Sequence, residues 1–211
     1  MYVQMCIKGL SGFPLDEAKA MLTKRGIACN WWRDAKHLSS AAIDQRLTPA
    51  ELDLHVNSYD EEHPERGGKV RDQTPFISLT AGAVERNAFL QTNQEYSAHR
   101  VATNFAIQFG KWRGDFFLFY CWVVVGMRPS LPVRHLAEEV RELNTYRAYS
   151  AFQLEGEIAA KIEVPARQIQ KFEHYTYTET RPGRKSISFV DSYLNPDYIE
   201  PHEITNYRDW F

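Results

Sequence analysis

The pattern of hydrophobic and polar positions predicts helices mainly in the first part of the chain and strands mainly in the last. Acidic residues open the segment 14–26, basic residues close it, and Gly26 follows as a stop signal, which is typical of a helix. Thr48-Pro-Ala-Glu51 has the capping-box pattern with Pro49 at the first helical position. The expected helices are an N-terminal extension over 1–26 with its helix at 14–26, a short helix opened by Thr48–Glu51 that carries His55, most of 81–110, and 133–143.

The longest apolar run, 116–126, is β-branched and aromatic throughout. It has about half of the roughly 20 residues needed to span a bilayer, so it predicts a buried strand. Because helices come early and strands cluster late, we expect a single α+β domain over 1–211 and not alternating βαβ units. The other expected strands are 27–33, 74–80, 157–164, 167–177 and 184–191.

Composition narrows the functional classes. Lys plus Arg total 25 and Asp plus Glu total 27, so a net charge of −2 argues against a generic basic nucleic-acid coat. Hydrophobic residues at 44% and charged residues at 25% exclude disorder. No phosphate loop, Rossmann glycine fingerprint, GxSxG elbow or HExxH motif occurs, which removes the commonest nucleotide and hydrolase interpretations.

Cysteine usage and the N-terminus bear on the cellular compartment. The three cysteines lie in apolar stretches without the spacing of a zinc site, so we expect buried free thiols and no metal. Residues 1–10 lack the pattern of a signal peptide, and no segment is suited to cross a membrane. These features favour a cytoplasmic protein without a membrane partner.

Glu155-Gly-Glu157 is the sharpest local feature. Residues two apart in a strand point the same way, so both carboxylates would face one pocket. Two like charges at short range push their pKa values apart, so that one carboxylate can act as a base while the other stabilises a cation. A solvated strand face would produce the same spacing.

Several segments around this pair occur in a characteristic chain order. These segments are Trp32-Arg33-Asp34, Leu54-His55, Phe76-Ile-Ser78-Leu-Thr80, Phe119-Tyr-Cys-Trp-Val-Val124, Glu155-Gly-Glu157 and Val164-Pro165-Ala-Arg-Gln-Ile169. The set resembles the mono-ADP-ribosyltransferases of the arginine–serine–glutamate class, most closely the group of the cholera toxin and heat-labile enterotoxin catalytic chains, over about residues 30–175. Two departures from the family occur: Asp34 follows Arg33 directly, whereas the family's first strand usually reads Tyr-Arg-x-Asp, and the stretch 84–114 is longer than the family suggests.

The resemblance implies an ADP-ribosyltransferase-like α+β fold, in which two packed, mainly antiparallel sheets form an NAD cleft with flanking helices. Its substrate would be NAD+, with Arg33 holding the pyrophosphate through its planar guanidinium. Glu157 would stabilise the oxocarbenium-like transition state as nicotinamide leaves, and Glu155 would orient or deprotonate the nucleophile. The resemblance also implies that Ser78 orients the catalytic glutamate and that His55 lies on the acceptor side. Asp34, Ser78 and Thr80 would bind NAD together with Arg33.

Each of these residues also has a structural interpretation. Arg33 beside two tryptophans fits a stacked surface arginine, His55 a structural histidine, and Ser78 a simple strand hydroxyl. In the family, the loop before the glutamate pair recognises the acceptor, although aromatic residues in such a loop can also be packing residues. The loop residues implied to contact the acceptor are Tyr146, Arg147, Tyr149 and Phe152.

The expected function is therefore an intracellular, toxin-like mono-ADP-ribosyltransferase, acting in a toxin–antitoxin or phage-defence system or as a bacterial effector. The macromolecular acceptor would be a protein arginine or a nucleic-acid base, and an inhibitor or antitoxin protein is a further candidate partner. Local basic patches over 96–114 and 166–188 fit either solvated surface or contact with a phosphate backbone. Two alternatives stay open: an NAD glycohydrolase on the same fold, and an interaction module that has lost catalysis.

Overall fold

The computed structural model describes residues 1–34, 40–87, 92–111, 114–126, 130–131, 133–140, 156–181 and 184–203. The strands are β1 (Tyr2–Ser11), β2 (Ile27–Ala28), β3 (Phe76–Thr80), β4 (Ala83–Asn87), β5 (Thr92–Tyr96), β6 (Gly114–Val125), β7 (Leu136–Glu139), β8 (Glu157–Lys161), β9 (Glu163–Val164), β10 (Ile169–Arg181) and β11 (Arg184–Leu194). The helices are α1 (Leu15–Ala20), which continues as the π-helix η1 (Met21–Arg25), α2 (Asn30–Asp34), α3 (Ser40–Asp44), α4 (Pro49–Asn57), α5 (Val70–Gln73), α6 (Ala98–Phe109), and the 3-10 turns η3 (Ala166–Gln168) and η4 (Pro201–Glu203).

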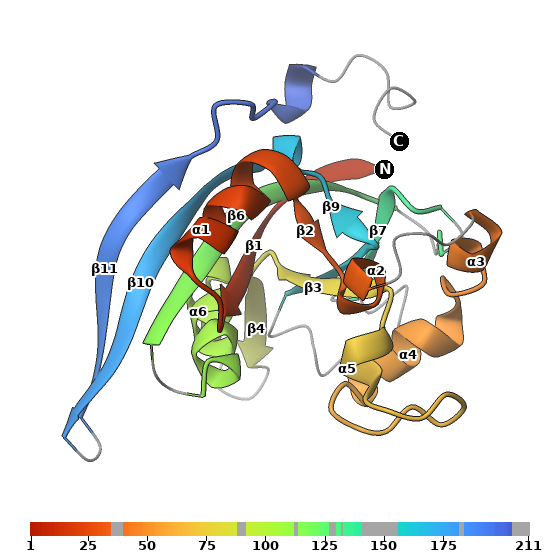
Figure 1. Ribbon diagram of the computed structural model, residues 1–211, viewed down its shortest axis with the longest axis horizontal. Helices are drawn as coiled ribbons and strands as arrows, with labels where there is room; N and C mark the ends of the chain where they lie inside the picture. The colour runs from red at the N-terminus through yellow and green to blue at the C-terminus, as the bar shows by residue number, and fades with distance from the viewer. Residues whose placement is uncertain are drawn as a thin grey trace.

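The fold is α+β, built on a mixed seven-stranded sheet of order β1-β3-β8-β7-β6-β10-β11 (Figure 1). Strand β1 also pairs with β6 from Tyr2–Val125 to Ser11–Phe116, so the pairings of β1, β3, β8, β7 and β6 form a closed circuit. Strands β6 and β7 are parallel. Two packed sheets were expected. The described residues instead form one large sheet and two short pairs, β2–β9 and β4–β5.

Strand β6 organises the core because it is buried on both faces. Phe117 and Phe119 pack in the cluster that contains α1 and η1, whereas Phe116 and Leu118 pack in the cluster that contains α6. Since successive side chains of a strand point to opposite faces, the two helices cover opposite sides of the sheet (Figure 1). The prediction of a buried strand over this apolar run is confirmed.

Strands β1 and β3 separate next to the candidate site. Their register is the single pair of Ile7 with Thr80. Beyond this point β3 stays with β8, while β1 stays with β6. Residues Lys8–Ser11 and Phe76–Ser78 therefore lie on two walls of one cavity.

The N-terminal segment differs most from expectation. The helix expected over 14–26 is present as α1 and η1, and Gly26 ends it with a φ of 67°. Residues 2–11, however, are not part of a helical extension. They form β1, because pairing along β6 buries Cys6 and Ile7 in the core.

Three further predictions were wrong in detail. Strand 27–33 ends at Ala28, and α2 follows it. The stretch 81–110 contains the hairpin β4–β5 before α6 begins. Within the segment expected as a helix over 133–143, the described residues 133–140 contain β7 instead, because pairing with β6 and β8 overrides the helical periodicity.

Other expectations hold. Cys6, Cys29 and Cys121 are buried free thiols, and burial raises the pKa of Cys29 to about 11 and that of Cys121 to about 12. Among the helices that the structure describes, none is long and apolar enough to cross a bilayer.

Candidate active site

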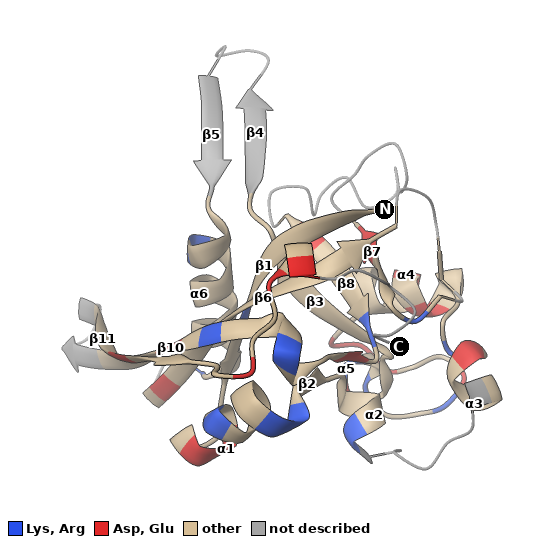
Figure 2. Ribbon diagram, turned by 90° about the horizontal axis from the view of Figure 1, so that it is seen from above, with Lys and Arg blue, Asp and Glu red and all other residues tan. Residues whose placement is uncertain are grey.

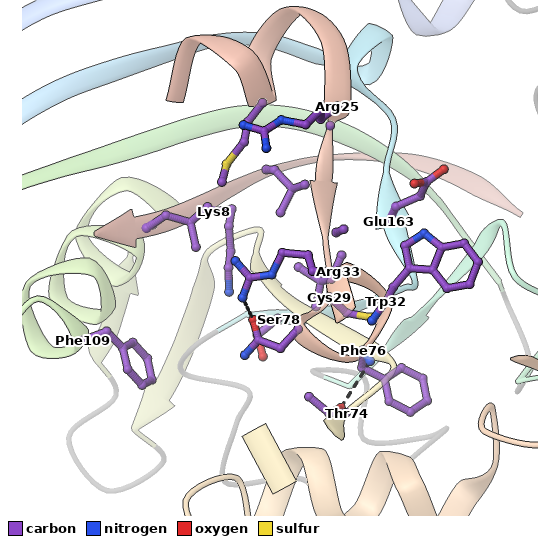
Figure 3. Close-up of a pocket in the computed structure, with 18 of the residues that line it drawn as sticks. Lys8, Arg25, Cys29, Trp32, Arg33, Thr74, Phe76, Ser78, Phe109 and Glu163 are labelled. Carbon is purple, nitrogen blue, oxygen red and sulfur yellow. Dashed lines mark hydrogen bonds between the residues drawn. The ribbon is translucent and has the colours of Figure 1, made fainter. Parts of the chain in front are cut away.

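Two adjoining cavities lie where β1 and β3 separate, with volumes of about 280 and 230 Å³. Their combined volume lies within the range of roughly 300–1,000 Å³ that is typical of small-molecule sites. The first extends towards α1, η1 and α2 (Figure 3), and the second extends towards α6 and Glu157. The residues that line both are Lys8, Gly9, His55, Tyr59, Ser78 and Phe109.

A polar group lies at the junction of the cavities. His55 Nε2 is 2.9 Å from Ser78 Oγ and 3.7 Å from Glu157 Oε1, and His55 Nδ1 is 2.9 Å from Thr74 Oγ1. Glu157 is 6% exposed, and it is the register partner of Thr80 on β3. A carboxylate, an imidazole and a serine hydroxyl thus meet at the cleft, and the imidazole is held by a hydroxyl on each ring nitrogen.

Helix α4 places His55. The Thr48 hydroxyl caps the helix by accepting from the Glu51 amide at 3.3 Å, as the capping-box pattern predicted. Glu51 is itself buried and pairs with Arg66 and, at 3.4 Å, with His63. These pairs tie the segment after α4 to the helix that carries the imidazole.

Cationic side chains line the first cavity. Lys8 projects from β1, and burial lowers the pKa of its ammonium group to about 8, although the negative charge of Glu157 offsets part of this effect. Arg33 on α2 is exposed and donates a hydrogen bond to Asn30 Oδ1. Arg25 at the end of η1 lines the same cavity, where it is paired with Glu17 at 2.7 Å. Figure 2 shows basic residues of η1 and α2 on one side of the molecule.

Aromatic rings form the α6 side of the cleft. Tyr59 and Phe109 pack edge to face with centroids 6.0 Å apart, and Phe105 and Phe109 stack at 6.3 Å. Phe109 is 50% exposed and lines both cavities. This aromatic wall adjoins the polar group, because Tyr59 packs edge to face against His55 with centroids 5.5 Å apart.

The structure brings together His55, Ser78, Thr80 and Glu157, the residues that the resemblance implied. Arg33 also lines the cleft, but from a short helix and not from a strand. Asp34 ends α2, and its side chain lies outside the described part of the structure. The predicted site residues outside the described part are Tyr146, Arg147, Tyr149, Phe152 and Glu155.

The strand geometry assumed for both glutamates does not extend to Gly156, and the common face of Glu155 and Glu157 stays a prediction because Glu155 lies outside the described residues. Strand β8 begins at Glu157, and Gly156 before it has a φ of 58°. A residue in the left-handed region breaks the two-residue alternation of a strand. The spacing Glu-Gly-Glu therefore does not by itself direct Glu155 and Glu157 to the same side.

Sequence reasoning missed Lys8 and Thr74. Lys8 escaped notice because its segment was expected to be helical, although the aromatic and β-branched residues of Tyr2–Ile7 are a usable strand signal. Thr74 comes just before β3 and has no motif of its own. Across the described residues, no group of three His, Cys, Asp or Glu side chains is placed to bind a metal.

The similarity of the chain to known proteins is structural. No family model and no curated protein matches the chain. Among solved structures, the chain is similar to one named EcPltA, with a TM-score of 0.51 and 12% sequence identity, over 94% of this chain and 89% of that chain. At this identity the likeness concerns architecture alone: the α+β fold described above is shared, nearly over its full length, with a solved protein.

Proposed function

We propose that the protein is an NAD-dependent mono-ADP-ribosyltransferase that transfers ADP-ribose to a macromolecular acceptor and releases nicotinamide. The observation that supports this most strongly is the meeting of Glu157, His55 and Ser78 in a cleft whose adjoining half carries Lys8 and Arg33. A divided cleft of this kind suits a dinucleotide, because the pyrophosphate requires positive charge and the nicotinamide riboside requires a carboxylate.

Glu157 is the catalytic residue in this proposal. When the bond between the ribose C1′ and the nicotinamide nitrogen breaks, its electron pair goes to the ring, which leaves as neutral nicotinamide. Positive charge develops on the ribose, and a buried carboxylate stabilises that charge more strongly than an exposed one. The acceptor nucleophile then bonds to C1′ and its proton passes to a base, the role that the resemblance implies for Glu155.

His55 and Ser78 would hold the Glu157 carboxylate and the ribose hydroxyls of NAD in position. The imidazole lies between Thr74 Oγ1 and Ser78 Oγ, so its ring plane is held while Nε2 stays 3.7 Å from the Glu157 carboxylate. Such support from neighbouring hydroxyls keeps a reacting group within the narrow geometry that catalysis requires.

Lys8 and Arg33 would bind the pyrophosphate. Figure 3 shows both side chains around the cavity that also contains Ser78. An ammonium and a guanidinium group donate charge-assisted hydrogen bonds to phosphate oxygens, which are stronger than bonds between neutral groups. The aromatic wall of Tyr59, Phe105 and Phe109 would cover a planar ring in the second cavity.

The test is incubation of the purified protein with NAD labelled in the adenylate part, with and without cell extract. Label in a macromolecule that protease releases would name a protein acceptor, and label that nuclease releases would name a nucleic acid. Release of nicotinamide without any labelled macromolecule would identify an NAD glycohydrolase instead. A protein that neither binds nor cleaves NAD would refute the enzymatic proposal.

A further inference from the structure

Gly82 and Gly156 are in direct backbone contact beside the start of β8. The Ala81 amide donates to the carbonyl oxygen of Gly156 at 2.9 Å, and both glycines have left-handed φ values, 78° and 58°. A Cβ on Gly156 would lie 2.5 Å from the carbonyl carbon and 2.7 Å from the nitrogen of Gly82, and closer still to its oxygen. Real Cβ atoms essentially never approach other atoms within 3.0 Å. Position 156 therefore excludes any side chain while Gly82 stays in place.

This contact lies immediately before the proposed catalytic carboxylate. Glu157 is the next residue, and it is aligned with Thr80, whose hydroxyl accepts from the Gly82 amide at 3.3 Å. Gly82 thus contacts the strand that carries Ser78 on one side and the residue preceding Glu157 on the other. Both contacts lie at the start of β8, whose first residue places its carboxylate 3.7 Å from His55 Nε2.

We propose that Gly156, through its contact with Gly82, is a positioning residue for Glu157. The inference rests on the proposed role of Glu157. With a side chain at position 156, the two backbones would have to separate by about 1 Å, and a displacement of that size can lower an enzymatic rate by roughly 100-fold. Such a displacement also exceeds the tolerance of about 0.5 Å within which catalytic groups must be held.

Two substitutions at position 156 distinguish the effect of the steric contact with Gly82 from the effect of the strained left-handed φ. Gly156→Ala introduces both a Cβ and an unfavourable left-handed φ, whereas Gly156→Asn introduces a Cβ in a residue that tolerates this φ. Gly67→Ala is the matched control, because Gly67 has a φ of 66° but nothing within 4 Å of the position that a Cβ would take. We expect both Gly156 variants to lower the turnover of NAD about 10- to 100-fold, to keep the Kd for NAD within about twofold, and to melt as cooperatively as Gly67→Ala.

A second measurement does not depend on turnover. Because the contact sets the distance between Glu157 and His55, the NMR signals of the His55 ring should shift in both Gly156 variants and stay in place in Gly67→Ala. If the wild-type protein does not cleave NAD, the proposed function fails, and these signals alone decide the positioning role. Wild-type turnover in Gly156→Asn, unchanged His55 signals, or loss of folding in both Gly156 variants would each overturn the proposal.

Discussion

Lys8 offers a test of cation placement in the cleft, because its charge should control the affinity for NAD over an accessible pH range. Burial lowers the pKa of the ammonium group to about 8, so about 90% of the molecules carry the charge at pH 7 and about 10% at pH 9. If the charged amine binds the pyrophosphate, affinity is present below pH 8 and is lost as the pH rises through this value. Titration calorimetry at pH 7, 8 and 9 should show a rise of about tenfold in the Kd for NAD.

Two variants provide the controls for this pH dependence. In Lys8→Arg the charge persists across the whole range, so the Kd should not change between pH 7 and 9. Lys8→Met should raise the Kd at pH 7 by roughly 10- to 100-fold, as expected for a lost charge-assisted hydrogen bond, and should also be independent of pH. Equal affinity of Lys8→Met and the wild type at pH 7 would refute the reasoning.

Three further predictions concern the hydrogen bond that holds His55, the packing of β1 against α6, and a buried ion pair between β7 and β8. Thr74→Val removes the hydroxyl next to His55 Nδ1 and should lower NAD turnover about 5- to 10-fold with an unchanged Kd for NAD; an unchanged rate would contradict the positioning of the imidazole. Gly9→Ala places a Cβ within 3.0 Å of the α6 backbone and should lower the free energy of unfolding in urea by about 1–3 kcal/mol, whereas wild-type stability would mean that α6 does not pack against β1 this closely. Glu138→Gln leaves the buried ammonium of Lys161 without its carboxylate partner at 2.6 Å and should cost about 3–5 kcal/mol, most of which the added change Lys161→Met should restore; a loss below about 1 kcal/mol would count against the pair.

The local sequence pattern was sufficient to predict β6 and α4. The β-branched and aromatic residues of β6 indicated a buried strand, and the capping residue Thr48 located the start of α4, and hence His55, correctly. Strand β1 was missed although Tyr2–Ile7 contain aromatic and β-branched residues, because this signal is short. Lys8 and Gly9 interrupt its pattern, and its stability comes from pairing with β6, which is distant in the sequence.

The same distinction applies to the site. Ser78 and Glu157 could be placed together because the chain order of several segments resembled a known class, and β3 and β8 do pair in register. Lys8 lines the cleft because β1 pairs along β6, and since this strand was not predicted, Lys8 was missed. Gly156 has a left-handed φ and contacts Gly82, which is distant in the sequence, and the local spacing of the two glutamates gave no indication of either.

The most direct test of the central claim is the rate of nicotinamide release from NAD by the wild type and by Glu157→Gln, with Glu203→Gln on η4 as a control for an exposed carboxylate. We expect the wild type and Glu203→Gln to cleave NAD at the same rate. We expect Glu157→Gln to bind NAD with a similar Kd but to release nicotinamide about 100- to 1,000-fold more slowly, because the amide no longer stabilises the developing positive charge. Equal rates for Glu157→Gln and the wild type would show that Glu157 is not the catalytic carboxylate.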